Sequence, residues 1–394
     1  MIAPIAMFRI RTLNAISQAG LSRLGADSFD VGPDVDDPHA ILVRSASLHG
    51  QPIPASLMAV ARAGAGTNNI PVAELSKRGI PVFNTPGSNA NAVKELVVAG
   101  IFLAARNIVD AAAFAHRLEG DHDTMEKLVE AGKKNYVGFE LPGRTLGVIG
   151  LGAIGVEVAN VAISLGMKVL GFDPAITVEH AWRLSSNVER VISLDQLLRR
   201  SDIVTLHIPL VDGTRGLIGD NQFRAMKNSA VLINFARGPI VDETALIEAL
   251  ESGQLRGYVC DFPTPLLNKR PRVVTLPHLG ASTREAEENS AVMAVEELRA
   301  YLVDGTIRNS VNFPNAQLAR SAGAQRIALT NANVPNMVAQ ISTIVGEAGL
   351  NIADLLNSSR GELAYTLVDV NGEVPASLVE RLGAIDGVLS ARSV

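Results

Sequence analysis

Three glycines, Gly150, Gly152 and Gly155, spaced as G-x-G-x-x-G, constrain this chain more than any other feature. They follow the apolar segment 146–149, expected to be a short buried β-strand, and precede the helix-like run 156–162. In such a turn the first glycine lets the chain reverse, the second lets backbone approach a pyrophosphate, and the third allows close packing of helix on strand. The helix N-terminus adds unpaired N–H groups that face an anion. The motif therefore predicts a dinucleotide-binding βαβ unit.

A carboxylate stands where such a unit binds ribose. The next apolar strand, 168–172, ends in Asp173, about 20 residues beyond the glycines, as a ribose-binding acid should be. An acidic side chain here accepts a hydrogen bond from the ribose 2′-OH of NAD and repels the additional phosphate of NADP. The alternative, a glycine-rich turn in an unrelated βαβ unit, leaves Asp173 unexplained. The sequence therefore predicts NAD as the cofactor.

Strand and helix patterns alternate on both sides of the motif, which indicates α/β architecture. Before the motif we expect strands at 8–13 and 40–44, a helix at 54–61, a strand with a turn at 80–87, and a long apolar helix at 91–109. From the motif onward we expect six strands, at 146–149, 168–172, 202–206, 230–234, 258–261 and 273–276. Six strands with intervening helices suit a doubly wound, Rossmann-like parallel sheet that binds ligands at the carboxyl ends of its strands.

The last 70 residues or so show a separate order of predicted strands and helices. They read as strand, helix, strand, strand, helix and strand, which is the ferredoxin-like βαββαβ pattern, with a tight turn at Asn371-Gly372. We therefore expect a discontinuous flavodoxin-like domain at 1–90 and 281–310, a Rossmann-like domain at 91–280, a linker at 311–323 and a tail domain at 324–394.

Composition narrows the functional class. The net charge of -5 and pI near 5.9 argue against a general nucleic-acid binder. No uncharged apolar run reaches the length of a membrane span, and the N-terminus lacks a secretory signal pattern. Cys260 is the only cysteine, so no intrachain disulfide can form, and the composition fits the reducing cytoplasm. No metal site is indicated.

Several stretches match one enzyme family in the same order along the chain. They are Arg62-Ala63-Gly64-Ala65-Gly66, residues 86–90, the glycine motif with Asp173, residues 207–210, Asn234-Phe235-Ala236-Arg237-Gly238 and residues 277–283. Because of these stretches, the part of the chain from residue 1 to about 310 resembles a D-2-hydroxyacid dehydrogenase. The tail makes the whole chain resemble the D-3-phosphoglycerate dehydrogenases with a C-terminal ACT domain. The resemblance implies NAD-dependent oxidation of the C2 hydroxyl of 3-phosphoglycerate, on the route to L-serine, in a homodimer or homotetramer.

The resemblance also assigns catalytic roles. His278 is expected to exchange the hydroxyl proton, because imidazole titrates near working pH, and Arg237 is expected to hold the substrate carboxylate and C2 oxygen with a two-pronged interaction. By type alone, a lone histidine or arginine is more often structural. Substrate contacts are expected from Arg44, Arg62, Ala63 and Gly64. Lys133 or Lys134 would reach a neighbouring subunit, although a solvated surface pair is the simpler reading.

The matching cofactor contacts extend through the second domain. They are Gly150, Gly152, Ala153, Ile154, Gly155, Asp173, His207, Pro209, Ala236, Asp261 and Gly280. The family usually carries a Glu that pairs with the histidine, yet the stretch 260–266 is one residue short and contains no Glu. Either Cys260 or Asp261 can take the nicotinamide-contacting position, and we favour Asp261. With no carboxylate partner for His278, we expect oxidation to persist to lower pH than in a Glu-paired relative.

In the tail, the resemblance implies that L-serine binds as an effector at a subunit interface, with Asn333 and Asn351 in the matching positions. Asn336 replaces the usual glycine after Pro335; Asn tolerates a left-handed backbone, but its side chain would narrow the pocket. Two other functions stay open: a different D-2-hydroxyacid dehydrogenase, such as a glyoxylate or hydroxypyruvate reductase, and an NAD-sensing binding protein. Arg44 and the tail disfavour the first, and intact Arg237 and His278 disfavour the second.

Overall fold

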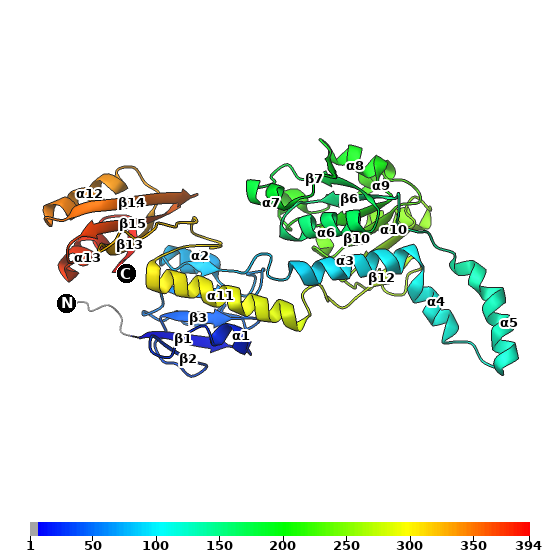
Figure 1. The fold of residues 1–394 in the computed structure, drawn as a ribbon, viewed down its shortest axis with the longest axis horizontal. Coiled ribbons are helices and arrows are strands. Elements are labelled where there is room, and N and C mark those ends of the chain that lie inside the picture. Colours follow the sequence, from blue (N-terminus) through cyan, green and yellow to red (C-terminus); the bar gives the residue numbers. More distant parts are fainter. Residues whose placement is uncertain (1–6) are drawn as a thin grey trace. The chain divides into compact units, whose positions relative to one another are not determined.

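A computed structural model describes residues 7–394, which divide into two compact units (Figure 1). One unit comprises residues 7–88 together with Arg284–Val394, and the other is Asn89–Thr283. The described part of the chain contains sheets of five, seven and four strands. The α/β fold class expected from the sequence is confirmed.

The unit Asn89–Thr283 is built on a seven-stranded sheet in which every neighbouring pair is parallel. Its order is β12-β11-β10-β9-β6-β7-β8, so the strand order reverses at β6, as in a doubly wound nucleotide-binding sheet. The strands are β6 (Thr145–Ile149), β7 (Lys168–Phe172), β8 (Val188–Arg190), β9 (Ile203–Leu206), β10 (Val231–Asn234), β11 (Gly257–Cys260) and β12 (Val273–Thr275). All six predicted strands are confirmed. The edge strand β8 was not predicted, because three residues with two charges carry no periodic signal.

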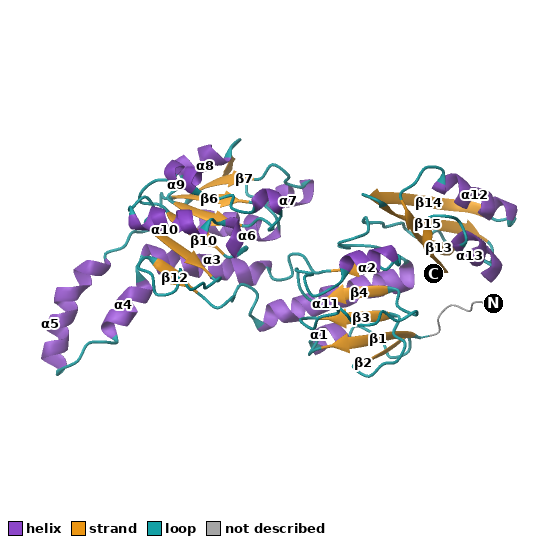
Figure 2. Cartoon of the chain, turned by 180° about the vertical axis from the view of Figure 1, so that it is seen from behind, coloured by secondary structure: helices purple, strands orange, loops and turns teal. Residues whose placement is uncertain are grey.

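Helices cover both faces of this sheet (Figure 2). On one face pack α3 (Ala90–Ala105) and α6 (Ala153–Ser164). On the other pack α8 (Leu194–Arg200), α9 (Asp220–Ala225) and α10 (Glu243–Glu251). The remaining helices are α4 (Ile108–Ala115), α5 (His122–Gly132) and α7 (Val178–Arg183), with short turns η1 (Lys133–Tyr136), η2 (Asp212–Thr214) and η3 (Gly238–Ile240). The predicted helix at 91–109 is interrupted, because Asn107 adopts a left-handed conformation with φ 51° between α3 and α4.

The other unit contains a five-stranded parallel sheet of order β2-β1-β3-β4-β5, the flavodoxin-like arrangement. Its strands are β1 (Phe8–Leu13), β2 (Phe29–Gly32), β3 (Ala40–Val43), β4 (Ala59–Arg62) and β5 (Val82–Phe83). Helix α11 (Arg284–Asp304) packs on one face beside α1 (Gln18–Leu21), and α2 (Val72–Lys77) packs on the other. The predicted helix at 54–61 is wrong. The apolar end of this segment is β4, which is buried and pairs with a strand on each side. Because apolar and polar residues do not alternate along such a buried strand, its sequence could not be distinguished from that of a buried helix.

The tail has the predicted βαββαβ order. Its elements are β13 (Gln325–Ala332), α12 (Met337–Glu347), β14 (Asn351–Arg360), β15 (Leu363–Asn371), α13 (Ala376–Gly383) and β16 (Val388–Ser393). The strands form an antiparallel sheet of order β14-β15-β13-β16, and both helices pack on one face of it. The ferredoxin-like prediction is confirmed.

The opposite face of the tail sheet packs on the end of α11. Tyr365 and Leu367 of β15 share a core with Tyr301 of α11, and this core also takes in Phe313 and Ala316 from the segment expected to be a linker. Tail side chains bind the last carbonyl groups of α11 and the residue after it: Arg326 Nη1 to Asp304 O (3.1 Å), Tyr365 Oη to Gly305 O (2.6 Å), Arg392 Nη1 to Leu302 O (3.0 Å) and Arg392 Nη2 to Tyr301 O. The last carbonyls of a helix have no intrahelical partners, and of these four only Tyr301 O also accepts a backbone hydrogen bond from the described part of the chain, that of Gly305 N–H (3.0 Å). The tail therefore caps α11.

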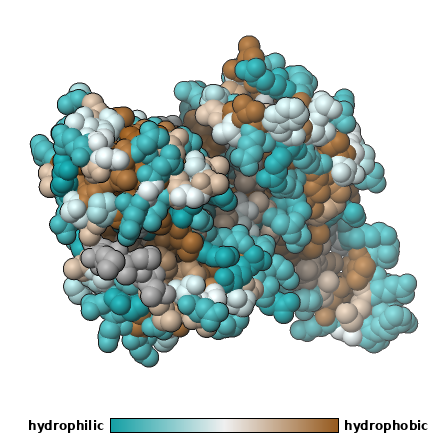
Figure 3. Space-filling model, turned by 60° about the vertical axis from the view of Figure 1, so that its left-hand side comes forward, coloured by the Kyte–Doolittle hydropathy of each residue, from teal (hydrophilic) through white to brown (hydrophobic). Residues whose placement is uncertain are grey.

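Hydrophilic side chains cover most of the face shown in Figure 3, and apolar ones form smaller patches. Within residues 7–394, no single helix combines the length and apolarity needed to cross a membrane; α3 and α4 reach them only as a pair bent by 64°. The same residues hold no cluster of three or more His, Cys, Asp or Glu side chains suited to a metal ion.

Candidate active site

The three motif glycines meet different surroundings between β6 and α6. Gly150 has φ 89°, where other residues are strained. A Cβ on Gly155 would lie 1.9 Å from the carbonyl oxygen of Gly150, so no side chain fits between helix and loop. A Cβ on Gly152 would have no described atom within 4 Å. The backbone at Gly152 is therefore open to a ligand, and the first N–H groups of α6, from Ala153 and Ile154, stand next to it. This loop fits a pyrophosphate.

Asp173 stands beside this loop at the end of β7. Its Oδ2 accepts a hydrogen bond from the N–H of Leu151 (2.8 Å), and its Oδ1 accepts one from the N–H of Ala175 (2.8 Å). A carboxylate has about four acceptor sites, so these bonds leave capacity for ribose hydroxyl groups. The structure thus places Asp173 and the glycine loop together and gives the carboxylate a second task, holding the loop.

His207 follows β9 on the other side of the loop. Its backbone N–H donates to Ile149 O (2.8 Å), and its Nε2 lies 2.9 Å from Thr205 Oγ1. Burial lowers the pKa of His207 to about 3, so its ring is neutral at physiological pH. Pro209, two residues on, accepts a hydrogen bond from Thr214 Oγ1 (2.6 Å). Both predicted residues therefore lie in the loop after β9, and neither adds a positive charge to the wall beside the glycine loop.

Arg237 is presented by a loop that Asn234 shapes. Asn234 is fully buried at the end of β10; its Nδ2 donates to Arg237 O (2.9 Å) and Tyr258 Oη (3.2 Å), and its Oδ1 accepts from the N–H of Ala236 (3.1 Å). The guanidinium of Arg237 donates to Ala236 O (2.6 Å) and lies at the surface. Asn234 lies in one of the stretches that match the family, but no role is expected of it from the sequence. Its signal is a polar amide as the last residue of an otherwise apolar, buried strand.

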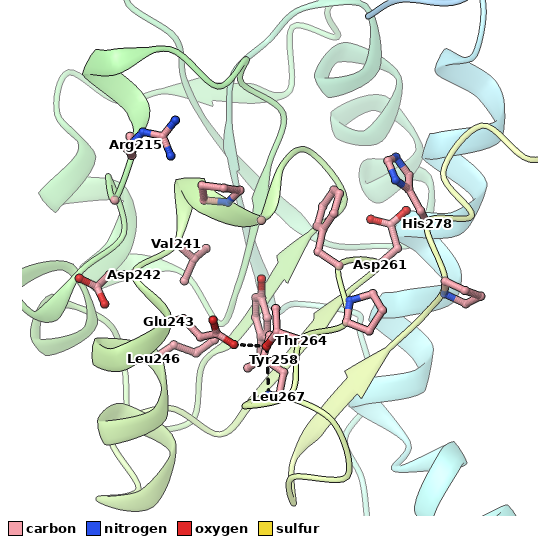
Figure 4. Close-up of a pocket in the computed structure, with 16 residues that line it drawn as sticks. Arg215, Val241, Asp242, Glu243, Leu246, Tyr258, Asp261, Thr264, Leu267 and His278 are labelled. Atoms are coloured by element: carbon pink, nitrogen blue, oxygen red, sulfur yellow. Dashed lines mark hydrogen bonds between the residues drawn. The ribbon is translucent and has the colours of Figure 1, made fainter. Parts of the chain in front are cut away.

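Asp261 and His278 come from neighbouring strands and are joined through their backbones. Asp261 follows β11 and His278 follows β12; the N–H of His278 donates to Asp261 O (3.0 Å), and that of Gly280 to Asp261 Oδ2 (3.1 Å). Asp261 is 1% exposed. Burial raises the pKa of Asp261, and the N–H of Gly280 and the charges of His278 and Arg237 partly offset that rise. Figure 4 shows the carboxylate of Asp261 next to the His278 ring.

His278 is also fixed by its own backbone and by an aromatic neighbour. Its φ is 50°, in the left-handed region that few residues other than glycine occupy. The ring of Phe262 meets the His278 ring edge-on, with centroids 5.2 Å apart. Local strain that surrounding contacts maintain is a feature of functional sites.

His278 stands at the rim of a pocket of about 750 Å³, lined by the start of α10, the residues around η3 and the chain at 262–267 (Figure 4). Within it Thr264 Oγ1 donates to the carboxylate of Glu243. The pocket is bounded by the segment in which the chain lacks one family residue. Nothing in the local sequence pattern of Glu243 or Thr264 indicated that they would meet here.

The predicted substrate residues lie in the other unit, at the carboxyl ends of β3 and β4. Arg62 Nε donates to Arg44 O (2.9 Å), and the N–H of Ala63 donates to Val43 O (2.9 Å). The Arg44 guanidinium forms an ion pair with Glu287 on α11. Gly64 follows directly, and its carbonyl accepts from Thr85 N–H (3.2 Å). The fold thus brings two arginines to one edge of this sheet.

The remaining predicted residues are dispersed. Lys133 is exposed and ion-paired with Glu130 on α5, as the surface alternative expects, and Lys134 lies beside it in η1. In the tail, Asn333 precedes α12 and donates through Nδ2 to Gly361 O (3.0 Å), whereas Asn351 follows α12 at the start of β14. The eleven residues of α12 separate them, about 16 Å of helix. One chain therefore does not bring the two asparagines together.

Asn336 is the N-cap that precedes α12, and its φ of 68° is the left-handed conformation for which a glycine would be usual.

Comparisons with known proteins agree with this geometry. Residues 101–280 match the family model "D-isomer specific 2-hydroxyacid dehydrogenase, NAD binding domain". The chain is 34% identical over 382 residues to D-3-phosphoglycerate dehydrogenase of Haemophilus influenzae, covering 93% of this chain and 89% of the relative. The corresponding enzyme of Methanocaldococcus jannaschii is 36% identical over 321 residues, or 80% of this chain and 57% of the relative. The chain belongs to the D-isomer specific 2-hydroxyacid dehydrogenase family.

Solved structures extend the likeness to three dimensions. D-mandelate dehydrogenase of Rhodotorula graminis superposes with a TM-score of 0.66 at 26% identity, covering 80% of this chain and all of that one. A D-isomer specific 2-hydroxyacid dehydrogenase of Lactobacillus delbrueckii ssp. bulgaricus, solved with NAD, gives 0.63 at 25% identity, covering 77% and all of the respective chains. The present chain is therefore an NAD-dependent oxidoreductase, and its own glycine loop and Asp173 fit that cofactor.

Proposed function

We propose that this dehydrogenase oxidises 3-phosphoglycerate at C2 to 3-phosphohydroxypyruvate with NAD, and so commits carbon to L-serine in the cytoplasm. The observation that carries the proposal is the position of Arg44 and Arg62. They lie together at the carboxyl edge of one sheet, where Arg62 Nε donates a hydrogen bond to Arg44 O. A substrate with a phosphate and a carboxylate requires cationic partners for both. Similarity to D-3-phosphoglycerate dehydrogenases over 93% of the chain supports the same substrate.

Two residues of the nucleotide-binding unit perform the proton and charge chemistry. NAD, when bound, supplies the acceptor for the hydride that leaves C2. An imidazole nitrogen of His278 takes the hydroxyl proton while the C2–O bond becomes a carbonyl, and in the reverse direction it returns that proton. Arg237 holds the carboxylate and the C2 oxygen, so the carbon is oriented and negative charge on the oxygen is stabilised. The contacts expected from His207, Pro209, Ala236, Asp261 and Gly280 hold the cofactor.

Different parts of the chain are assigned to the cofactor, the substrate and regulation. We assign residues 91–280 to NAD, residues 1–90 with 281–310 to the substrate, and residues 324–394 to an ACT regulatory domain behind the segment 311–323. Because Asn333 and Asn351 lie at opposite ends of α12, an L-serine site that uses both takes one from each of two chains. That arrangement requires a homodimer or homotetramer.

Steady-state kinetics test the assignment. The purified protein is assayed with NAD and 3-phosphoglycerate, with glycerate as the unphosphorylated match, and with glyoxylate and hydroxypyruvate in the reducing direction. We expect kcat/KM for 3-phosphoglycerate to exceed that for glycerate by at least about 100-fold, since losing a charged contact costs about 2–3 kcal/mol or more. Preference for glyoxylate or hydroxypyruvate assigns the protein to the reductases instead. Millimolar L-serine, added to the same assay, tests the effector.

A further inference from the structure

The side chain of Asn14 binds the backbone of the loop that begins at Arg44. Its Oδ1 accepts hydrogen bonds from two successive N–H groups, those of Ser45 (3.0 Å) and Ala46 (2.6 Å). Strand β1 ends one residue before Asn14, and it pairs in parallel with β3, which ends one residue before Arg44 (Figure 1). The asparagine therefore reaches from the end of one strand to the loop that follows its neighbour.

The backbone of Asn14 explains part of the choice of residue but not all of it. Its φ is 69°, in the left-handed region that glycine occupies most readily. Among residues with a side chain, asparagine tolerates this region better than most. A glycine would make the same turn, but it would offer no acceptor to the two N–H groups. The acceptor oxygen is therefore the feature that the asparagine adds.

Other side chains bind the carbonyl groups of the same loop. Arg62 Nε donates to Arg44 O (2.9 Å), and Asn69 Nδ2 donates to Ala46 O (2.7 Å). Backbone groups of a surface loop can be satisfied by water alone, so side-chain partners on successive residues fix the position of this loop. The guanidinium of Arg44 is ion-paired with Glu287. Both the main chain and the charged group of Arg44 thus have defined partners.

We infer that Asn14 is a positioning residue for Arg44. By binding the N–H groups of residues 45 and 46, it fixes the place from which the arginine extends and so increases the affinity for the phosphate of the substrate. The inference rests on the proposed role of Arg44 as the phosphate contact. A loop that is ordered before the ligand arrives spares binding the cost of ordering it. Asn14 therefore acts on KM and not on the chemical step.

Amide hydrogen exchange tests the hold on the loop without any substrate. Peptides that span residues 43–47 are followed in the unaltered full-length protein, in N14G and in N14D. N14G keeps the left-handed turn and removes the acceptor, whereas N14D keeps an acceptor oxygen. We expect exchange at residues 45 and 46 to be at least about fivefold faster in N14G and unchanged in N14D. Equal exchange in all three proteins overturns the inference.

Steady-state kinetics connect the loop to the phosphate. In N14G we expect KM for 3-phosphoglycerate to rise about three- to tenfold, while kcat and the KM for glycerate change little. The matched control is N107G. Asn107 is also a left-handed asparagine, with φ 51°, and its Nδ2 binds the carbonyls of Tyr136 (3.3 Å) and Val137 (3.2 Å) in the other unit. Equal rises for both substrates in N14G, or the same rise in N107G, overturn the inference.

A double-mutant cycle shows whether Asn14 acts through Arg44. Once R44A has removed the guanidinium, N14G should raise KM for 3-phosphoglycerate by less than about twofold, because the group that it positions is gone. Effects of N14G that are as large in the R44A background as in the unaltered protein overturn the inference.

The same assays separate this inference from the proposed substrate. An unaltered protein with no preference for 3-phosphoglycerate over glycerate refutes the substrate, and the exchange experiment alone then decides for or against Asn14. A preference that N14G retains in full refutes the role of Asn14 and leaves the substrate in place.

Discussion

The guanidinium of Arg44 is ion-paired with the carboxylate of Glu287, which lies in the first turn of α11. Both side chains are about two-fifths exposed, at 43% and 41%, so the pair is accessible to a ligand. A phosphate that binds Arg44 meets the negative charge of Glu287 as well. If Arg44 binds the phosphate as proposed, Glu287 competes with the substrate for the arginine.

The first prediction concerns this competition. R44A should raise KM for 3-phosphoglycerate by at least about tenfold and change KM for glycerate little, because only the phosphate contact is lost. E287Q should lower KM for 3-phosphoglycerate a few-fold, since an exposed ion pair is worth under about 1 kcal/mol. The matched control is E296Q, which removes the acid of another exposed pair on α11, Arg23–Glu296. Equal effects on both acids would remove Arg44 from the phosphate site.

The second prediction separates the roles of two glycines. G152A adds a methyl group where no described atom lies within 4 Å, at a φ of −74° that alanine adopts freely. We expect an unchanged melting temperature and a Kd for NAD raised at least about tenfold, because the methyl group occupies space the cofactor needs. G155A places a methyl group 1.9 Å from Gly150 O and should lower the melting temperature itself. Scanning calorimetry and NAD titration give the two readouts; tight NAD binding by G152A would contradict the prediction.

The third prediction concerns Glu297, a carboxyl group 5% exposed on α11. Its Oε1 accepts from Asn309 Nδ2 (2.7 Å), and its Oε2 has no hydrogen-bond partner within the described chain. Burial raises the pKa of Glu297 from 4.5 to about 8, an effect that Asn309 and Arg308 reduce and Glu296 increases. The folded state thus retains a proton that the unfolded chain loses above about pH 4.5. Stability must fall as pH rises through this window, with a slope of about 1.4 kcal/mol per pH unit.

E297Q removes that slope while keeping an acceptor for Asn309. We expect it to melt higher than the unaltered protein at pH 8 and at about the same temperature at pH 4.5, measured by calorimetry across the range. The control variant is E285Q, at an exposed acid of α11 that does not act on Glu297, and it should follow the unaltered protein. Parallel curves for E297Q and the unaltered protein would show that Glu297 is ionised in the folded state.

The fourth prediction concerns the ion pair of Arg326 and Asp369, whose side chains are 1% and 0% exposed. Two charge-assisted hydrogen bonds join them, Nε to Oδ1 (2.6 Å) and Nη2 to Oδ2 (2.8 Å). D369A leaves a buried guanidinium unpaired and should cost about 3–5 kcal/mol. E347A, which breaks the exposed pair Arg381–Glu347, should cost under about 1 kcal/mol. Denaturant unfolding of the tail, followed by amide exchange, compares them; similar losses would contradict the difference in burial.

The same pair predicts sensitivity to acid. Burial would raise the pKa of Asp369, but hydrogen bonds from Arg326 and from Ser321 N–H outweigh it and lower the pKa below its ordinary value. Its stabilising contribution is therefore complete above about pH 4 and is lost as pH falls further, as the carboxylate becomes protonated in the folded state.

The sequence predicted those features that repeat along the chain or sit in short motifs. Strands such as β6 and β10 are apolar runs of four or five residues bounded by turns. Asp173 follows directly after its strand, and Arg237 and His278 lie three residues after theirs. Runs without alternation were ambiguous, so β4 was predicted as a helix. The three residues of β8 carried no pattern at all.

Pairings between distant residues could not be predicted. Arg326 and Asp369 are 43 positions apart, and Arg44 and Glu287 are 243 apart. Nothing in the local pattern of any of these residues specifies a partner, because the partner is set by the packing of elements in three dimensions. The missing Glu was visible in the sequence, whereas the position of the Asp261 carboxylate beside His278 required the fold.

The capped end of α11 has a consequence for shortening the gene. A stop codon after residue 323 would remove the groups that bind the carbonyls of residues 301, 302, 304 and 305, and would leave Tyr301 without its aromatic neighbour Tyr365 and the overlying Arg392. Such a product should be prone to aggregation and proteolysis, because the end of α11 would lose both its capping groups and its aromatic packing. Whether the tail regulates the enzyme is therefore better tested by altering single residues of the tail than by deleting it.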